Sequence, residues 1–354
     1  MVMIHKLGLI YTGGTIGASV KQCGEFAKDL NLKRVRKELE SKISLLRDRS
    51  IEYVWKNPVN VFSERMIASD WKSIAQAIDE AIKEGVSGIV VLHGTDTMAY
   101  TAAALSFMLQ GVKVPVVLTG ANEPLIKEET DATRNMTDAI FVAKQRGLRG
   151  VFVVFSGHPK RASYIHLGTR VRKYQFTSNC YMSVNAKPIG KVERNLLTRT
   201  PYIRYMNRDL LERVTKINRH KEYLLRENVC DEVFLFKVHP SFRATQIGEC
   251  PGKGIILELY NSGTGCDIHT ERYNLLQNIE KQKAPIFATS QQLGSIDMST
   301  YESSIRIRDA GVTQLGDMTT EAALAKLIWV LGQTQEIKNI KDLMLENLAG
   351  EISR

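Results

Sequence analysis

The sequence predicts an α/β protein of two domains, a larger N-terminal doubly wound parallel-sheet domain and a smaller C-terminal α/β domain. The chain has 354 residues, more than double the length of about 150 that is typical of one domain. In its first half, short apolar runs alternate with segments of helical periodicity, the pattern of β-α units around a parallel sheet. A second, shorter series of such units follows a polar stretch.

The N-terminal series begins with an apolar strand at residues 7–11, after which residues 21–50 are polar and strongly charged. Ser69 can cap a helix that Gly85 ends. The apolar positions of this helix recur at helical spacing, at Trp71, Ile74, Ile78 and Ile82. The other elements that we expect here are strands at 88–92, 114–118 and 151–155 and helices near 98–109 and 132–144.

The domain boundaries follow from composition. Residues 194–228 are charge-dense with few apolar runs, which is typical of a connection. We therefore assign residues 1–200 to the N-terminal domain, 201–230 to a linker and 231–354 to the C-terminal domain. The elements expected in the C-terminal domain are strands at 254–260 and 285–289 with a helical segment between them, then helices at about 320–331 and 336–347.

The overall composition is that of a globular protein, with 44% hydrophobic and 24% charged residues, which excludes broad disorder. No apolar run is long enough to span a membrane, and the first residues lack the pattern of a signal peptide. The five cysteines are scattered without a C-x-x-C pair, as expected for free thiols in a reducing compartment. We therefore expect a cytoplasmic protein with no membrane contact.

The net charge of +10 is unevenly distributed. Between Asp138 and Glu193 there are ten basic residues and no acidic one. This basic stretch, which runs from Lys144 to Lys191, can attract an anionic partner such as RNA. The alternative is a solvated basic face without a partner, because charge sets encounter rate and not identity.

Two turns that follow strands contain unusual residues. The first is Tyr11-Thr12-Gly13-Gly14-Thr15-Ile16-Gly17, and the second is His93-Gly94-Thr95-Asp96-Thr97-Met98. Ligands of an open parallel sheet bind at the carboxyl ends of its strands. Neither turn has the spacing of a nucleotide-binding motif, so hydroxyl nucleophile chemistry is favoured over phosphate binding. The alternative is that these side chains only satisfy turn backbone and cap a helix.

Together the two motifs resemble the signatures of the bacterial-type (type I) L-asparaginase and glutaminase family. The resemblance covers nearly the whole chain and implies the asparaginase fold. In its details the chain looks like the asparaginase-like glutaminase subunit of the archaeal Glu-tRNA(Gln) amidotransferase. The segments that carry this likeness are 60–66, 168–173, 326–332 and 349–352.

The resemblance implies catalytic roles for four residues. Thr12 matches the family's first nucleophile, which attacks the side-chain carboxamide carbon and forms an acyl-enzyme that water hydrolyses. Thr95, Asp96 and Lys173 match its second triad. There the lysine amine, which we expect to be kept neutral by burial, acts as base for the threonine hydroxyl or its water.

The resemblance also implies substrate-binding residues. Ser63 matches the residue that holds the substrate α-carboxylate, and Glu64 matches the one that pairs with its α-ammonium. Backbone N–H groups of the glycine turns, including that of Gly94, are expected to stabilise the oxyanion.

The chain departs from the family pattern at several positions. Glu25 stands where the family's mobile lid has a tyrosine, and it can serve as a substitute base at the substrate site. Thr264 replaces an asparagine that a neighbouring subunit offers to the site. Residues 290–292 replace the allosteric cysteine of cytoplasmic type I enzymes. We also expect the chain to lack the extra N-terminal domain of the amidotransferase glutaminase.

Three functions agree with these observations. The first is an amidohydrolase that releases ammonia from asparagine, glutamine or a related carboxamide, working as a homodimer or homotetramer. The second is an ammonia-supplying glutaminase subunit with a tRNA-binding amidotransferase partner. The third is a non-catalytic relative that binds amino acids. None of them requires a cofactor or a metal, because threonine-based amide hydrolysis needs neither.

Overall fold

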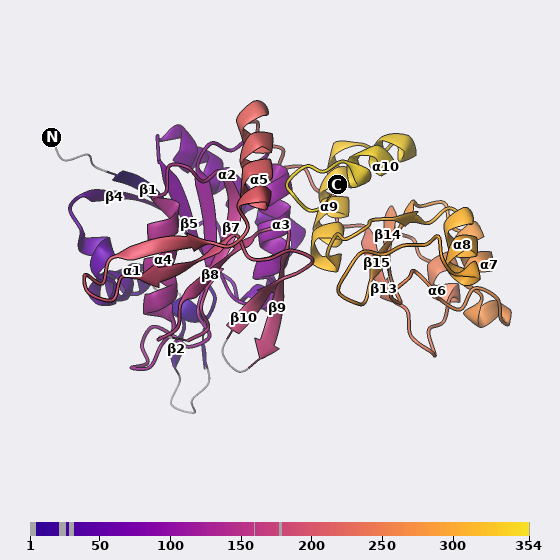
Figure 1. Ribbon diagram of the computed structural model, residues 1–354, viewed down its shortest axis with the longest axis horizontal. Coiled ribbons are helices and arrows are strands. Elements are labelled where there is room, and N and C mark those ends of the chain that lie inside the picture. Colours follow the sequence, from indigo (N-terminus) through magenta and orange to yellow (C-terminus); the bar gives the residue numbers. More distant parts are fainter. Residues whose placement is uncertain (1–4, 21–25, 28–31, 159, 177–178, 354) are drawn as a thin grey trace. The chain divides into compact units, whose positions relative to one another are not determined.

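The computed structural model describes residues 5–20, 26–27, 32–158, 160–176 and 179–353. The chain divides into two compact units, Met1–Glu227 and Asn228–Arg354 (Figure 1). Each unit is a sheet covered by helices. The predicted α/β class, with a larger parallel-dominated N-terminal domain and a smaller C-terminal one, is confirmed.

The first unit is built on an eight-stranded mixed sheet. Its strands are, in spatial order, β12 (Pro201–Tyr205), β11 (Gly190–Arg194), β8 (Ser163–Leu167), β7 (Gly150–Phe155), β6 (Pro115–Thr119), β5 (Gly88–Leu92), β1 (His5–Tyr11) and β4 (Ile51–Lys56). The strands from β7 to β4 are parallel, and β8, β11 and β12 are antiparallel. Strands β5 and β6 are buried at every residue, as central parallel strands are when helices cover both faces.

Helices lie on both faces of this sheet. The helices of the unit are α1 (Leu32–Lys42), α2 (Ala68–Lys83), α3 (Met98–Met108), α4 (Ala132–Ala143) and α5 (Arg208–His220). Apolar residues of α1, α4 and α5 share one core cluster with alternate residues of β1, β5 and β7. On the opposite face, Trp71 of α2 donates to Thr101 of α3 at 3.0 Å.

The sequence missed several polar elements of this unit. The charged stretch 21–50 contains α1, and the expected linker at 201–230 contains β12 and α5, both inside the first unit. The residue that caps α2 is not Ser69, because the helix begins at Ala68 and the Asp70 carboxylate accepts the Ile67 N–H at 2.9 Å. Helix α5 has only a narrow buried stripe, at Leu210, Val214 and Asn218. Because most of its residues are polar, the composition of this segment indicated a linker.

Two pairs of strands lie outside the main sheet. Strands β2 (Ser19–Val20) and β3 (Phe26–Ala27) pair antiparallel. Strands β9 (Val171–Phe176) and β10 (Asn179–Ser183) form an antiparallel hairpin, in which Tyr181 is opposite Lys173. This hairpin contacts α3 and β7.

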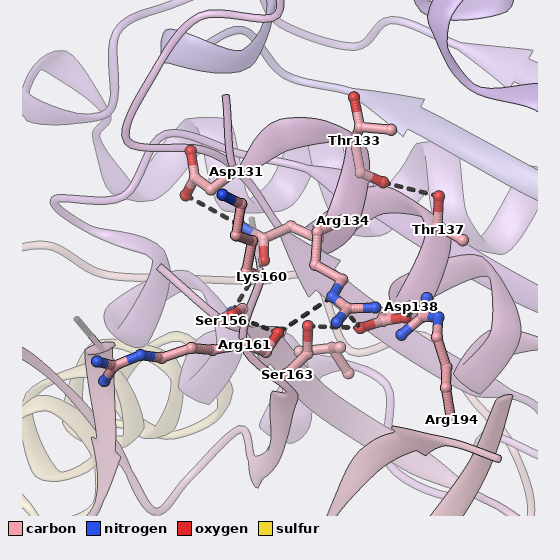
Figure 2. A network of polar contacts seen from close by, with 12 residues as sticks. Asp131, Thr133, Arg134, Thr137, Asp138, Ser156, Lys160, Arg161, Ser163 and Arg194 are labelled. Carbon is pink, nitrogen blue, oxygen red and sulfur yellow. Dashed lines mark hydrogen bonds and ion pairs between the residues drawn. The ribbon is translucent and has the colours of Figure 1, made fainter. Parts of the chain in front are cut away.

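A buried ion-pair network joins α4 to the antiparallel part of the sheet (Figure 2). The Asp138 side chain is fully buried and accepts from Arg194 of β11 at 2.6 Å and from Ser163 of β8 at 2.8 Å. Arg134 lies one turn before Asp138 and donates to the Arg161 carbonyl at 3.0 Å. A buried carboxylate needs such partners, so the network fixes the position of α4 on the sheet.

The second unit has a four-stranded parallel sheet in the order β13 (Val233–Lys237), β14 (Gly254–Leu259), β15 (Ile286–Ser290) and β16 (Thr313–Gln314). Its helices are α6 (Thr245–Gly248), α7 (Leu275–Glu280), α8 (Glu302–Asp309), α9 (Thr320–Gln333) and α10 (Ile337–Leu345). Residues of α6, α7 and α8 share a core cluster with β14 and β15. Helix α9 contacts β13, β14 and β15, and α10 packs on α9.

A fully buried ion pair holds the last residues of this unit. Lys326 of α9 donates to Glu351 at 2.6 Å, and both side chains are 0% exposed. Lys326 also donates to the carbonyls of Met344 and Glu346, while Glu351 accepts the N–H groups of Leu348 and Ala349. These bonds satisfy both charges without water.

The described helices include none that combines the length and the apolar character needed to cross a membrane. Of the cysteines whose side chains the structure describes, Cys230, Cys250 and Cys266 are free thiols.

We predict that Lys326→Met lowers the free energy of unfolding of the second unit by about 3–5 kcal/mol, because it leaves the Glu351 charge buried and unpaired. Trp329 lies on the same helix, so its fluorescence during urea unfolding measures this effect in a Trp55→Phe/Trp71→Phe background. The matched control is Lys253→Met, which removes the exposed ion pair with Glu232 in the same unit. Equal effects of the two substitutions would contradict the prediction.

Candidate active site

The two motif turns pack directly against each other. Gly13 and Gly14 have positive φ angles of 103° and 84°. A Cβ on Gly14 would lie 2.5 Å from the Cα of Gly94, and a Cβ on Gly13 would lie 2.3 Å from the Val61 carbonyl oxygen. Only glycine fits at these positions, and the close approach brings the turn after β1 against the turn after β5.

Thr12 lies at the tip of β1 and is 0% exposed. Its N–H and its hydroxyl both donate to the Leu92 carbonyl, at 3.0 and 2.9 Å. Its own carbonyl accepts from the Val61 N–H at 3.0 Å. The Thr12 hydroxyl is therefore held by main-chain groups at the end of β5, just before the second motif.

Thr95, Asp96 and Lys173 come together, although Lys173 is far from the others in sequence. The Lys173 amine donates to the Thr95 hydroxyl at 3.0 Å and to the Asp96 carboxylate at 2.5 Å. Hairpin strand β9 carries Lys173, and the other two residues lie in the turn before α3. The burial expected for this amine is only partial, because the Lys173 side chain is 33% exposed and that of Asp96 is 57% exposed.

Ser63 holds the second motif from the other side. It is buried in a short 3₁₀ turn, Ser63–Arg65. Its hydroxyl accepts from the Asp96 N–H at 3.1 Å, and its carbonyl accepts from the Thr97 hydroxyl at 2.8 Å. A Cβ on Gly94 would lie 2.5 Å from the Ser63 Oγ, so Gly94 allows this contact.

The remaining residues are those expected to bind substrate and those at which the chain departs from the family pattern. Glu64 follows Ser63 in the same turn and is exposed. Glu25 lies outside the described residues. In the second unit, the Thr264 carbonyl accepts from the Tyr260 N–H at 3.3 Å. Gln291 donates to the Val238 and Glu258 carbonyls, at 2.6 and 2.9 Å.

No motif in the sequence indicated Tyr181. This residue is opposite Lys173 in the β9–β10 hairpin, and its hydroxyl donates to the Thr95 carbonyl. The only signal in the sequence is its position eight residues after Lys173, which becomes informative once the hairpin register is known.

His93 is a buried structural neighbour of the site. Its Nδ1 donates to the Gly94 carbonyl at 2.7 Å, and its Nε2 lies 3.0 Å from the Met66 sulfur. Burial lowers the pKa of His93 to about 4. The imidazole is therefore neutral at pH 7 and supplies shape and a hydrogen bond, not charge.

The basic stretch between Asp138 and Glu193 does not form one solvated face. Arg170 is buried, Lys173 lies in the site, and Lys191 pairs with Glu193. Lys160 and Lys187 are among those exposed to solvent. Several of the ten basic residues therefore do not contribute a free positive charge to the surface, and this stretch is less basic at the surface than its composition indicates.

The arrangement brings two hydroxyls, an amine and a carboxylate to the carboxyl edge of a parallel sheet, where ligands of this class of fold bind. A hydroxyl next to an amine that a carboxylate orients is the arrangement of nucleophile and general base. Backbone N–H groups of the glycine turns supply candidate donors for an oxyanion. An arrangement of these groups can carry out acyl transfer.

Comparison with protein families agrees with the fold and with this site. Residues 6–202 match the family model "Asparaginase, N-terminal", and residues 232–344 match "Glutaminase/Asparaginase C-terminal domain". The chain belongs to the asparaginase and glutaminase family.

Relatives of two kinds resemble the chain. One subunit of the Glutamyl-tRNA(Gln) amidotransferase of Methanobrevibacter smithii is 35% identical over 83% of the chain, which spans 65% of that relative's length. The L-asparaginase of Thermococcus kodakarensis is 34% identical over 98% of this chain and 99% of that one.

Two solved structures have the same fold along the whole chain. The thermostable L-asparaginase from Thermococcus kodakarensis superposes with a TM-score of 0.83 and 32% identity, covering 99% of each chain. L-asparaginase I from Vibrio cholerae gives a TM-score of 0.81 at 26% identity, covering 99% of this chain and 100% of the other.

We predict that the first unit loses stability as the pH falls from about 6.5 toward 4. Burial lowers the pKa of His93 to about 4 and that of His166 to about 3. Between these values and about 6.5, the two histidines are protonated in the unfolded chain but not in the folded one, so a falling pH favours unfolding. Each histidine contributes at most about 1.4 kcal/mol per pH unit, and its contribution is complete above about 6.5.

The measurement is urea unfolding at a series of pH values. His166→Gln is expected to flatten the dependence of the free energy of unfolding on pH between about 4 and 6.5. The control, His239→Gln, removes an exposed histidine of the second unit. If His166→Gln leaves the dependence of the free energy of unfolding on pH unchanged, the loss of stability is not due to protonation of His166.

Proposed function

We propose that this protein is an amidohydrolase that cleaves the side-chain carboxamide of asparagine, glutamine or a related amide by threonine nucleophilic catalysis. The observation that carries the proposal is the contact of one amine, that of Lys173, with both Thr95 and Asp96. Thr12 lies at the neighbouring strand end, bonded to the residue before the second motif. Membership of the asparaginase family agrees with this reaction.

In the first half-reaction, the Thr12 oxygen attacks the carboxamide carbon. The Thr12 proton passes to the departing nitrogen, so that ammonia leaves and an ester of Thr12 remains. In the second half-reaction, water attacks that ester, one of its protons returns to the Thr12 oxygen, and the acid is released. Lys173, oriented by Asp96, assists proton transfer to and from Thr95 and the attacking water.

Substrate recognition is assigned to the 3₁₀ turn that contains Ser63 and Glu64. Ser63 offers a hydroxyl for the substrate α-carboxylate, and Glu64 offers an exposed carboxylate for the α-ammonium. Because Ser63 also holds the Asp96 N–H, binding and catalysis share one rigid contact.

The prediction for this mechanism is that Thr12→Val and Lys173→Met each lower kcat for ammonia release by about 10³-fold or more. Thr137→Val is the matched control, because Thr137 also donates its hydroxyl to a main-chain carbonyl, that of Thr133, on helix α4. Ammonia is measured with asparagine, glutamine, their D-forms and short peptides that contain them.

Acid quenching and peptide mass spectrometry then locate the acyl-enzyme. An ester on the peptide that contains Thr12 supports the proposal. An ester on Thr95 alone refutes the assignment of Thr12 as the nucleophile of the first half-reaction. If the wild-type chain binds amino acids by calorimetry but releases no ammonia from any amide, the chain is a non-catalytic relative instead.

A second candidate function is the ammonia-supplying glutaminase subunit of a tRNA-dependent amidotransferase. The likeness to amidotransferase subunits and the exposed Lys160 and Lys187 favour it. We expect labelled tRNA to bind in a salt-dependent way and Lys160→Glu/Lys187→Glu to weaken that binding. The deciding test is co-purification with a tRNA-binding amidotransferase partner, because a chain that stays alone in the presence of that partner and charged tRNA cannot be such a subunit.

We also propose that the chain acts as a homodimer or homotetramer in a reducing, cytoplasmic compartment. The free thiols of Cys230, Cys250 and Cys266 agree with such a compartment. Light scattering of the purified chain tests the oligomeric state, and a monomer at micromolar concentration would contradict it.

A further inference from the structure

Tyr181 lies next to the candidate site, and the proposed mechanism gives it no role. It lies on β10, is 4% exposed and donates its hydroxyl to the Thr95 carbonyl. Its ring packs edge to face against Phe155 at the end of β7, with the ring centroids 5.1 Å apart. The Tyr181 ring therefore packs on a residue of the main sheet.

The hydrogen bond of Tyr181 acts on one end of a particular peptide group. The Thr95 carbonyl and the Asp96 N–H belong to the same planar unit, which moves as one body. Tyr181 binds its oxygen, and the Ser63 hydroxyl accepts its N–H at 3.1 Å. The peptide group between Thr95 and Asp96 is thus fixed at both ends by side chains from two other elements.

This peptide group carries the two partners of Lys173. The Thr95 and Asp96 side chains branch from the Cα atoms on either side of it, and both contact the Lys173 amine. A change in the backbone torsions on either side of this peptide, ψ of Thr95 or φ of Asp96, turns the two Cα–Cβ bonds relative to each other and moves the hydroxyl and the carboxylate apart. Hydrogen bonds at both ends of the peptide restrict these torsions and so help to hold the two partners of Lys173 together.

Lys173 and Tyr181 also reach the turn from the same place. They are paired across the β9–β10 hairpin, a two-stranded sheet separate from the main one. The hairpin thus delivers the amine and the phenol together, one to the side chains of the turn and the other to its main chain.

We propose that Tyr181 is a positioning residue, whose phenol holds the Thr95–Asp96 peptide in the orientation that the Lys173 triad needs for turnover. The inference rests on the proposed amidohydrolase function and extends it to a residue that acts through the main chain of Thr95.

The test compares Tyr181→Phe with Tyr53→Phe. Both substitutions remove a tyrosine hydroxyl that donates to a main-chain carbonyl, and both keep the ring. Tyr53 lies on edge strand β4 and donates to the Leu45 carbonyl at 2.9 Å. A role limited to stability would lower the stability of either variant without a specific loss of kcat.

Steady-state kinetics separates binding from turnover. Tyr181→Phe is expected to lower kcat by about 10- to 100-fold with KM within about threefold, while Tyr53→Phe changes neither. Thermal unfolding of both variants verifies that they are folded. A kcat for Tyr181→Phe equal to that of Tyr53→Phe overturns the proposal.

A second measurement does not depend on activity. The rate at which an amine-reactive reagent labels Lys173, followed by peptide mass spectrometry, reports how firmly its partners hold it. Asp96→Asn is the positive control, because it removes the carboxylate partner. If the wild-type chain releases no ammonia, the proposed function fails and the labelling decides alone. Faster labelling in Tyr181→Phe than in Tyr53→Phe supports positioning, and equal rates overturn it.

Discussion

The candidate site depends on the close approach of two glycine turns at the carboxyl edge of the main sheet. Gly14 lies so near Gly94 that a Cβ would approach the Gly94 backbone to 2.5 Å, and Gly13 lies equally close to Val61. A side chain at Gly14 would push apart the turns that follow β1 and β5, and a side chain at Gly13 would clash with the Val61 backbone. The contact needs positive φ angles, which glycine adopts at little cost. Every other feature of the site is built around this contact.

The functional side chains come from separate elements that meet at these turns. Thr12 directly follows strand β1, the turn before α3 carries Thr95 and Asp96, a 3₁₀ turn carries Ser63, and a hairpin carries Lys173. The second motif is held on one side by Ser63 and on the other by Lys173 and Tyr181. Because its main chain is held at both ends of one peptide group, the turn does not depend on its own residues alone for its shape.

The sequence predicted the parts of the fold in which hydrophobic pattern and structure coincide. Strands β1, β5, β6 and β7 are apolar runs, and α2 has clear helical periodicity. Helices α1 and α5 were missed because each buries only a narrow stripe of a mostly charged surface. For the site, the motifs indicated Thr12, Thr95 and Asp96, and the family resemblance indicated Lys173. Tyr181 carries no motif, since its importance depends on a cross-strand register and on a bond to a main-chain atom.

The two threonines differ in a way that bears on the proposed mechanism. The Thr12 hydroxyl is buried and donates to the Leu92 carbonyl, which is not a base. The Thr95 hydroxyl accepts from an amine that is also bonded to a carboxylate and is partly open to solvent. For a hydroxyl in the first environment, the nitrogen of the substrate is one group that can take up its proton. A hydroxyl in the second has a route for protons toward water. On the proposed mechanism, acylation at Thr12 is therefore coupled to proton transfer to the leaving nitrogen, and the Thr95 triad serves the step that admits water.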